Sequence, residues 1–136
     1  IVARIRTLCQ RFKVRRIAYD PWSATQMATQ LADEGLPMGE VRQGFRSLSE
    51  PSKKLEGLIL QRKLRHGGNP LLAWSVSCAC VEIDPAGNCK PSKRASTERI
   101  DPLAALVTAL AGWMYGGGEQ SGPSIYEEPG KAIEWV

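Results

Sequence analysis

The sequence has only one histidine and four cysteines, the residues that most often bind zinc. Its single histidine, His66, is not at ligand spacing from another metal-binding residue. The four cysteines follow no common zinc-binding pattern; they are Cys9, Cys78, Cys80 and Cys89. We therefore expect the thiols to be reduced and to pack in the core, as free cysteines usually do.

Features of membrane insertion, secretion and nucleotide binding are also missing. The longest apolar stretch, residues 103–115, is too short to cross a bilayer. The N-terminus does not have the basic-then-apolar pattern of a signal peptide. No Gly-x-x-x-x-Gly-Lys-Ser/Thr loop is present, so we expect no nucleotide site of that kind. The chain also begins without methionine, which suggests a segment of a longer protein.

Charge is distributed unevenly along the 136 residues. Residues 1–65 carry 13 Lys and Arg against 6 Asp and Glu, whereas residues 66–136 carry 5 against 8. A basic half with a few acidic residues is typical of a phosphate-binding surface that also holds a cation, although a merely solvated basic face has the same composition. The hydrophobic content of 43% and the charged content of 24% are those of one ordinary globular domain.

The first forty residues have the pattern of a parallel α/β unit. Apolar residues recur at helical spacing over residues 1–12, and a short apolar run predicts a strand at 14–19. The sequence Ser23-Ala-Thr-Gln26 is a capping-box pattern, which predicts a helix from about 25 to 34. With a second strand expected at 36–41, the β–α–β order is typical of parallel strands.

The middle of the chain predicts two helices and a hairpin. A loop is expected at 43–49, followed by a helix at 51–62. Asn69 and Pro70 are a favourable N-cap and first residue for the next helix. Residues 81–90 then predict a hairpin around a Pro-Ala-Gly-Asn turn.

The last predicted helix spans 102–114 and should be buried. Its apolar stripe is wide enough to face a core; it consists of Leu103, Leu106, Val107, Leu110 and Trp113. Glycines end the helix, and Gly, Pro, Ser and Glu are frequent after it. We therefore predict a domain at 1–115 and a tail at 116–136.

Two aspartates lie where the backbone is expected to be rigid. Asp20 ends the predicted 14–19 strand, at the edge where open α/β sheets place ligands. Asp101 precedes Pro102, which places the carboxylate in the first turn of the last helix. Paired carboxylates in a basic chain are typical of a divalent-metal site acting on phosphodiesters. Taken singly, each also suits a plain turn or helix cap.

The segment that leads into Asp101 is basic and rich in hydroxyl groups. Such a mixture can contact a DNA backbone without reading its sequence, although a flexible basic loop would look the same. The cations are Lys90, Lys93, Arg94 and Arg99. Nearby, we expect Glu82 to have a surface role and Trp22 to pack against the protein.

Five consecutive motifs resemble the C-terminal nuclease domain of the large terminase subunit of tailed bacteriophages. The first two are Ile17-Ala-Tyr-Asp-Pro-Trp-Ser-Ala-Thr-Gln26 and Glu40-Val-Arg-Gln-Gly-Phe-Arg-Ser-Leu-Ser49. The others are Leu64-Arg-His-Gly-Gly-Asn-Pro70, Ile83-Asp-Pro-Ala-Gly-Asn-Cys-Lys-Pro91 and Ser96-Thr-Glu-Arg-Ile-Asp101. They occur in the family's order over about residues 1–115.

That resemblance implies an RNase H-like α/β fold, with a mixed sheet flanked by helices. It implies an endonuclease that cuts concatemeric, double-stranded phage DNA during packaging in the host cytoplasm. The implied partners are the portal protein and the small terminase subunit. An acidic cluster that includes Asp20 and Asp101 would hold Mg²⁺ or Mn²⁺. The implied reaction is in-line attack by a metal-activated water, with a second ion stabilising the leaving oxygen.

In the family, a further acidic residue lies on the first strand of the fold, which we expect upstream of Ile1. The chain is therefore expected to lack its first strands and to be inactive alone. Two other functions remain open. One is a transposase, integrase or resolvase of the same fold; the other is a non-catalytic DNA-binding or assembly module that docks on the portal through Glu119, Glu127 and Glu128.

Overall fold

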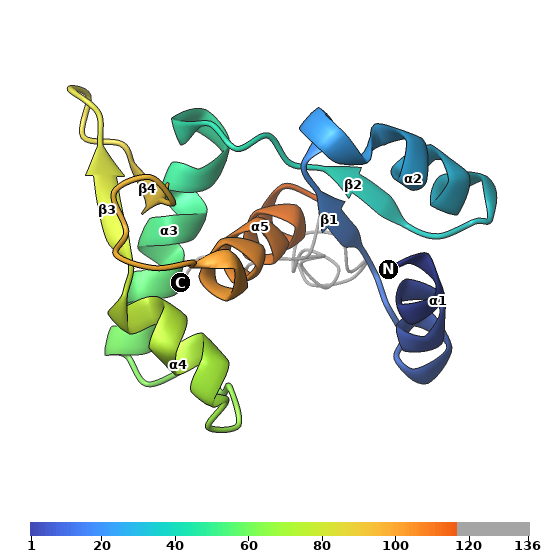
Figure 1. Ribbon diagram of the computed structural model, residues 1–136, viewed down its shortest axis with the longest axis horizontal. Helices are drawn as coiled ribbons and strands as arrows, with labels where there is room; N and C mark the ends of the chain where they lie inside the picture. The colour runs from blue at the N-terminus through green and yellow to red at the C-terminus, as the bar shows by residue number, and fades with distance from the viewer. Residues whose placement is uncertain (117–136) are drawn as a thin grey trace, which may run out of the picture.

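The last helix, α5 (Asp101–Tyr115), lies at the centre of the molecule (Figure 1). The computed structural model describes residues 1–116, so the predicted tail lies outside the described residues except for Gly116. Helix α3 (Phe45–Leu60) and the hairpin of β3 (Cys80–Ile83) and β4 (Cys89–Ser92) flank α5 on one side. Strands β1 (Ile17–Tyr19) and β2 (Met38–Glu40), with α2 (Pro21–Asp33), flank it on the other.

The predicted parallel β–α–β unit is confirmed. Strand β1 pairs in parallel with β2, and Tyr19 lies opposite Glu40. The backbone N–H of Val41 continues the ladder by donating to the Tyr19 carbonyl at 2.8 Å. Both strands are shorter than predicted, and β3 and β4 form a separate two-stranded sheet. The carboxyl ends of β1 and β2 therefore lie at one edge, where Asp20 and Gln43 follow them.

Helix α2 begins earlier than the capping-box pattern predicts. Asp20 is the N-cap, and its carboxylate accepts a hydrogen bond from the backbone N–H of Trp22 at 3.2 Å. Pro21 then occupies the first helical position, where the missing N–H of proline costs nothing. The prediction of a start near Thr25 is wrong because Asp-Pro is itself a strong helix start.

The predicted loop at 43–49 is also wrong, because α3 begins at Phe45. Pro51 lies inside this helix instead of starting it. A proline there removes one helical hydrogen bond and costs about 3 kcal/mol. Leu48 and Pro51 are both buried, and burial of a leucine side chain alone stabilises by about 1.5–3 kcal/mol. Burial of this first half of α3 therefore offsets the broken hydrogen bond.

Helix α4 (Pro70–Ser77) and the hairpin follow the prediction. The Asn69 side chain accepts a hydrogen bond from the Leu72 N–H at 3.0 Å and so caps α4. In the hairpin, Glu82 lies opposite Lys90. The Asp84 carboxylate closes the turn by accepting from the backbone N–H of Ala86 and of Asn88, both at 2.9 Å.

We expect the hairpin turn to loosen in acid. The hydrogen bonds from Asn88 lower the pKa of Asp84 below its ordinary value. A lowered folded-state pKa contributes stability that is present above the unfolded value of about 3.9 and is lost as pH falls through the folded one. The amide proton shifts of Ala86 and Asn88, followed by NMR, should therefore titrate together below that value. In Asp84→Ala this common titration should disappear; its persistence would contradict the assignment.

The core forms where α5 meets α3, α4 and β1. Its buried residues are Val41, Leu48, Leu55, Ile100, Leu103, Val107 and Ala111. The predicted stripe of α5 is confirmed for its first four members, since Leu106 and Leu110 pack against this cluster. Trp113 is an exception with 40% of its surface exposed. Gly112 takes the buried position beside it, because α5 approaches β1 too closely there for a side chain.

Helix α1 (Val2–Arg11) lies at the edge of the molecule and contains no buried residue. A side-chain hydrogen bond connects α1 to the rest of the protein, donated by Arg6 to the Glu34 carboxylate just after the end of α2. All four cysteines are half-buried free thiols, and only Cys78 packs against the core. None of the helices within residues 1–116 combines the length and the hydropathy needed to cross a membrane.

Candidate functional site

A cleft of about 690 Å³ opens between α5, the carboxyl edge of β1 and the end of strand β4. Asp20 and Asp101, the two carboxylates singled out in the sequence, both line it. Along α5 the lining extends from Asp101 to Thr108, a rise of about 10 Å at 1.5 Å per residue. The cleft is therefore a groove along the first two turns of α5.

Asp20 is held at one end of this groove. It is half-buried and follows directly on β1, so the strand and the cap of α2 together restrain it. Gln43, from the neighbouring strand end, donates a hydrogen bond to Thr108 at 3.3 Å. That contact ties the carboxyl edge of the β1–β2 pair to the second turn of α5. The position of the Asp20 carboxylate is thus set by main-chain geometry and not by a flexible loop.

Asp101 is the first residue of α5, as Pro102 predicted. Its carboxylate is 60% exposed and lies 2.5 Å from the Lys93 ammonium. The hydrogen bond from Lys93 lowers the pKa of Asp101 below that of an ordinary aspartate. The positive end of the helix dipole acts in the same direction. Asp101 is therefore an ionised, accessible carboxylate on the groove.

Three of the four predicted DNA-binding cations line the groove: Lys90, Lys93 and Arg94. Arg99 does not; it lines a smaller hollow of about 360 Å³, which shares Lys93 and Asp101 with the groove. The Lys90 ammonium also lies 5.0 Å from the centre of the Phe45 ring. One wall of the groove is thus positively charged, and the predicted phosphate contacts stay a prediction.

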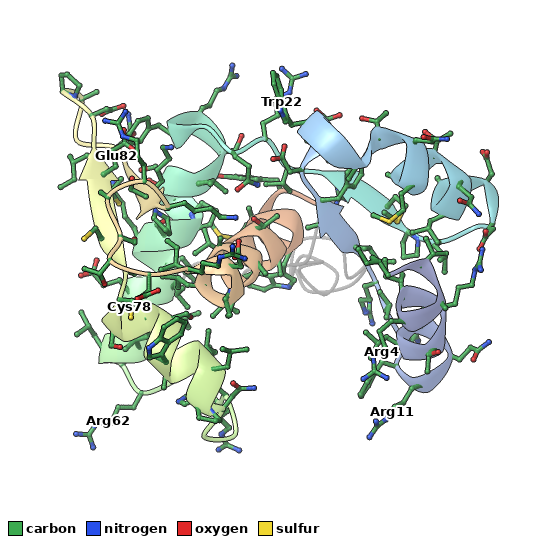
Figure 2. The ribbon with its side chains drawn as sticks, viewed as in Figure 1. Arg4, Arg11, Trp22, Arg62, Cys78 and Glu82 are labelled. Atoms are coloured by element: carbon green, nitrogen blue, oxygen red, sulfur yellow. The ribbon has the colours of Figure 1, made fainter. Side chains whose placement is uncertain are left out.

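The sequence reasoning missed Glu82 as a member of this groove. Glu82 lines it and lies 3.6 Å from the Lys90 ammonium across the hairpin. Figure 2 shows Glu82 on β3. The cross-strand register could have indicated this pair, since opposite charges often face each other in hairpins. The expectation of a purely surface role for Glu82 is therefore too narrow.

Trp22 does not pack as predicted. It is 93% exposed and points outward from the first turn of α2 (Figure 2). His66, the single histidine, lies away from the groove and lines an apolar hollow beside α3 and α4.

The groove offers the donor types that a magnesium ion takes. Mg²⁺ is usually held by one or two carboxylates, with waters and substrate phosphates completing its shell. Asp20 and Asp101 are carboxylates of this kind, and one of them is exposed to the groove. No cluster of three or more His, Cys, Asp or Glu side chains able to hold a metal occurs within residues 1–116. These residues therefore fit a metal ion that takes two ligands from the protein and the others from water and substrate phosphates.

The model of one protein family, described as the terminase large subunit endonuclease domain, matches residues 1–116. The chain belongs to this family. The match includes both aspartates, the basic wall of the groove and all nine helices and strands of the described residues. The predicted resemblance to the terminase nuclease domain is thereby confirmed.

Individual relatives agree with the family. The terminase large subunit of Enterobacteria phage HK97 is 33% identical over 112 residues, which cover 81% of this chain and 22% of that protein. Protein YmfN of Escherichia coli K12 is 32% identical over 93 residues, covering 67% of this chain and 20% of its own length. The terminase large subunit of Lactococcus phage SK1 is 28% identical, over 79% of this chain and 20% of its own. The chain thus spans about a fifth of the curated relatives it matches.

The fold of this chain also agrees with that of a solved terminase structure. The crystal structure of the HK97 bacteriophage large terminase superposes with a TM-score of 0.74 at 33% identity. The superposition covers 81% of this chain and 23% of that one. The predicted RNase H-like α/β class is therefore confirmed.

Proposed function

We propose that this chain forms the nuclease part of a viral DNA-packaging terminase. In the complete gene product it would cut concatemeric phage DNA in a reaction that requires Mg²⁺ or Mn²⁺. The observation that carries this proposal is the shared groove, to which Asp20 and Asp101 contribute carboxylates and the β4 side contributes cations. The terminase names of the HK97 and SK1 relatives support the same function.

In this proposal the two aspartates hold the divalent metal. Asp20 presents its carboxylate from a strand end and Asp101 from a helix start, so neither has to be ordered when the metal binds. A bound divalent ion would lower the pKa of a coordinated water and neutralise charge on the reacting phosphate. The proposed task of the protein is to hold both carboxylates in place.

The basic wall is proposed to hold the DNA backbone. Lys90, Lys93 and Arg94 lie beside a groove about 10 Å long along α5, which corresponds to roughly three nucleotides of one B-form strand. Contacts of this kind position DNA without reading its sequence. Affinity should therefore fall steeply with salt and depend little on base composition.

We further propose that the 136-residue chain binds DNA but does not cut it. The two aspartates are fewer carboxylates than a two-metal site generally uses, and residues 1–116 contain no cluster of three or more side chains able to hold a metal. The portal protein, the small terminase subunit and the host cytoplasm belong to the same proposal for the complete gene product.

The test is a nicking assay on supercoiled plasmid with the complete gene product that contains these residues. We expect cleavage with Mn²⁺ or Mg²⁺ and none after EDTA, because the proposed reaction needs the ion to activate water. The 136-residue chain alone should shift the same DNA on a gel in a salt-sensitive manner without nicking it.

Three outcomes would contradict the proposal. Cleavage that persists in EDTA would remove the metal from the reaction. Strong preference for branched or transposon-end DNA over linear duplex would instead favour a resolvase or transposase. DNA binding with no cleavage by the complete gene product at any divalent metal would indicate a non-catalytic module.

A further inference from the structure

The Asp101 carboxylate accepts a hydrogen bond from a cation of the protein itself. Lys93 Nζ lies 2.5 Å from Asp101 Oδ1, and both side chains are largely exposed, at 63% and 60%. The same two residues line the groove and also the smaller hollow next to it. The carboxylate proposed to hold a metal is therefore already engaged by an ammonium group that lies on the DNA-facing wall.

Hydrogen bonds restrain the backbone on both sides of Lys93. Ser96 donates from its N–H and its hydroxyl to the Ser92 carbonyl, at 3.1 and 2.6 Å. The Ser96 hydroxyl also accepts from the Cys80 N–H at 2.9 Å, which ties the turn to the start of β3. Ser92 is buried. A lysine on such a turn can move its ammonium by several ångströms on its four-carbon stem without disturbing the fold.

We propose that Lys93 couples DNA binding to metal binding at Asp101, an inference that rests on the proposed function of the groove. Without DNA, the ammonium occupies Asp101 Oδ1 and competes with a divalent ion for that oxygen. A DNA phosphate in the groove offers Lys93 another anion. Once Lys93 turns to the phosphate, the carboxylate is free for the ion. Lys93 is thus a positioning residue that links the metal site to the presence of substrate.

This coupling has a thermodynamic consequence. If Lys93 releases Asp101 only when DNA is bound, DNA must raise the affinity for the metal, and the metal must raise the affinity for DNA by the same factor. An exposed ion pair contributes little, so the share of this factor due to Lys93 is about two- to fivefold. Because a change in metal affinity of about two- to fivefold is small, the experiment needs a matched control variant.

Arg94 provides that control. It is the next residue along the chain and lines the same groove. Among the ion pairs of residues 1–116, Lys93 pairs with Asp101 whereas none involves Arg94. Lys93→Met and Arg94→Met each remove one cation from one wall, so a general effect of charge on the metal is common to both. Only the first variant removes the competitor at Asp101.

The experiment measures Mn²⁺ affinity of the complete gene product by electron paramagnetic resonance of the free ion. It is made with and without a short DNA duplex whose integrity is checked on a denaturing gel. We expect Lys93→Met to bind Mn²⁺ about two- to fivefold tighter than wild type without DNA and equally tightly with DNA. Arg94→Met should show only the smaller, general effect of removing a cation from the wall, and Lys93→Arg should keep the wild-type coupling.

The inference would be overturned if Lys93→Met bound Mn²⁺ without DNA no tighter than Arg94→Met did. It would also be overturned if the factor by which DNA tightens Mn²⁺ binding were the same in both variants. Failure of the proposed function has a different signature. In that case Asp101→Asn would leave Mn²⁺ binding unchanged, and the wild-type gene product would not cut plasmid. This result would overturn both proposals together.

Discussion

Replacement of Asp101 by asparagine in the complete gene product should lower metal-dependent plasmid cleavage by about a hundredfold to ten-thousandfold. A metal ion that polarises a phosphate and activates water supplies several kcal/mol of transition-state stabilisation, and each 1.36 kcal/mol is a factor of ten in rate. Asparagine keeps the size of the side chain but loses the charge that holds the ion. Asp20→Asn should have an effect of the same order.

Both substitutions should spare the fold. Asparagine is as good an N-cap as aspartate, so Asp20→Asn retains the start of α2. At position 101 the loss is an exposed ion pair with Lys93, which contributes roughly 0–1 kcal/mol. Thermal unfolding of the two variants should therefore remain close to wild type, and their DNA affinity should change by less than about threefold.

The matched control for these variants is Asp33→Asn. Asp33 is the last residue of α2, at the opposite end from Asp20, and it is exposed and outside the groove. Its replacement should leave the cleavage rate at the wild-type level. Full cutting by both Asp20→Asn and Asp101→Asn, measured beside this control, would remove the two aspartates from the proposed metal site.

Gly112→Ala should destabilise the protein by about 1–3 kcal/mol through overpacking. Gly112 is buried in α5, where a Cβ would lie 2.7 Å from the Cβ of Ala18 in β1. Such a contact forces the helix and the strand apart. The helix propensity gained by replacing glycine with alanine, about 1 kcal/mol at most, offsets only part of this cost. The measurement is chemical denaturation, with the shift of the midpoint at unchanged m-value.

The same substitution at Gly57 should have the opposite sign. Gly57 lies in α3, and the nearest atom to an added Cβ there is the end of the Gln61 side chain at 3.8 Å. Gly57→Ala should therefore stabilise by about 0.5–1 kcal/mol. A second check is the pair Ala18→Gly with Gly112→Ala, which moves the methyl group across the interface. The coupling between the two changes should be favourable; additive effects would show that the α5–β1 approach is not the cause.

The Gly112 contact also bears on the site. It sets how closely α5, which begins with Asp101, lies to β1, which ends before Asp20. In the complete gene product, Gly112→Ala should consequently reduce cleavage more than its loss of stability explains.

Most of the local structure could be predicted from the sequence because its causes lie within a few residues. Asn69 caps α4 and Asp84 closes the hairpin turn, each through hydrogen bonds to backbone N–H groups a few residues away, and Pro102 favours the start of α5 through its fixed backbone angle. One error, the start of α2, came from choosing the weaker of two local signals, whereas at α3 burial overrode a local rule. Pro51 lies inside α3 because Leu48 is buried against residues far along the chain.

Local patterns were enough to predict that Asp20 follows a strand, that Asp101 starts a helix and that cations precede Asp101. The motifs also indicated the family. The packing of distant segments brings both carboxylates to one groove, places Glu82 in its wall and pairs Lys93 with Asp101. These relations depend on how α5 packs between the hairpin and β1. That packing is set by apolar contacts between residues distant in sequence, which no local pattern specifies.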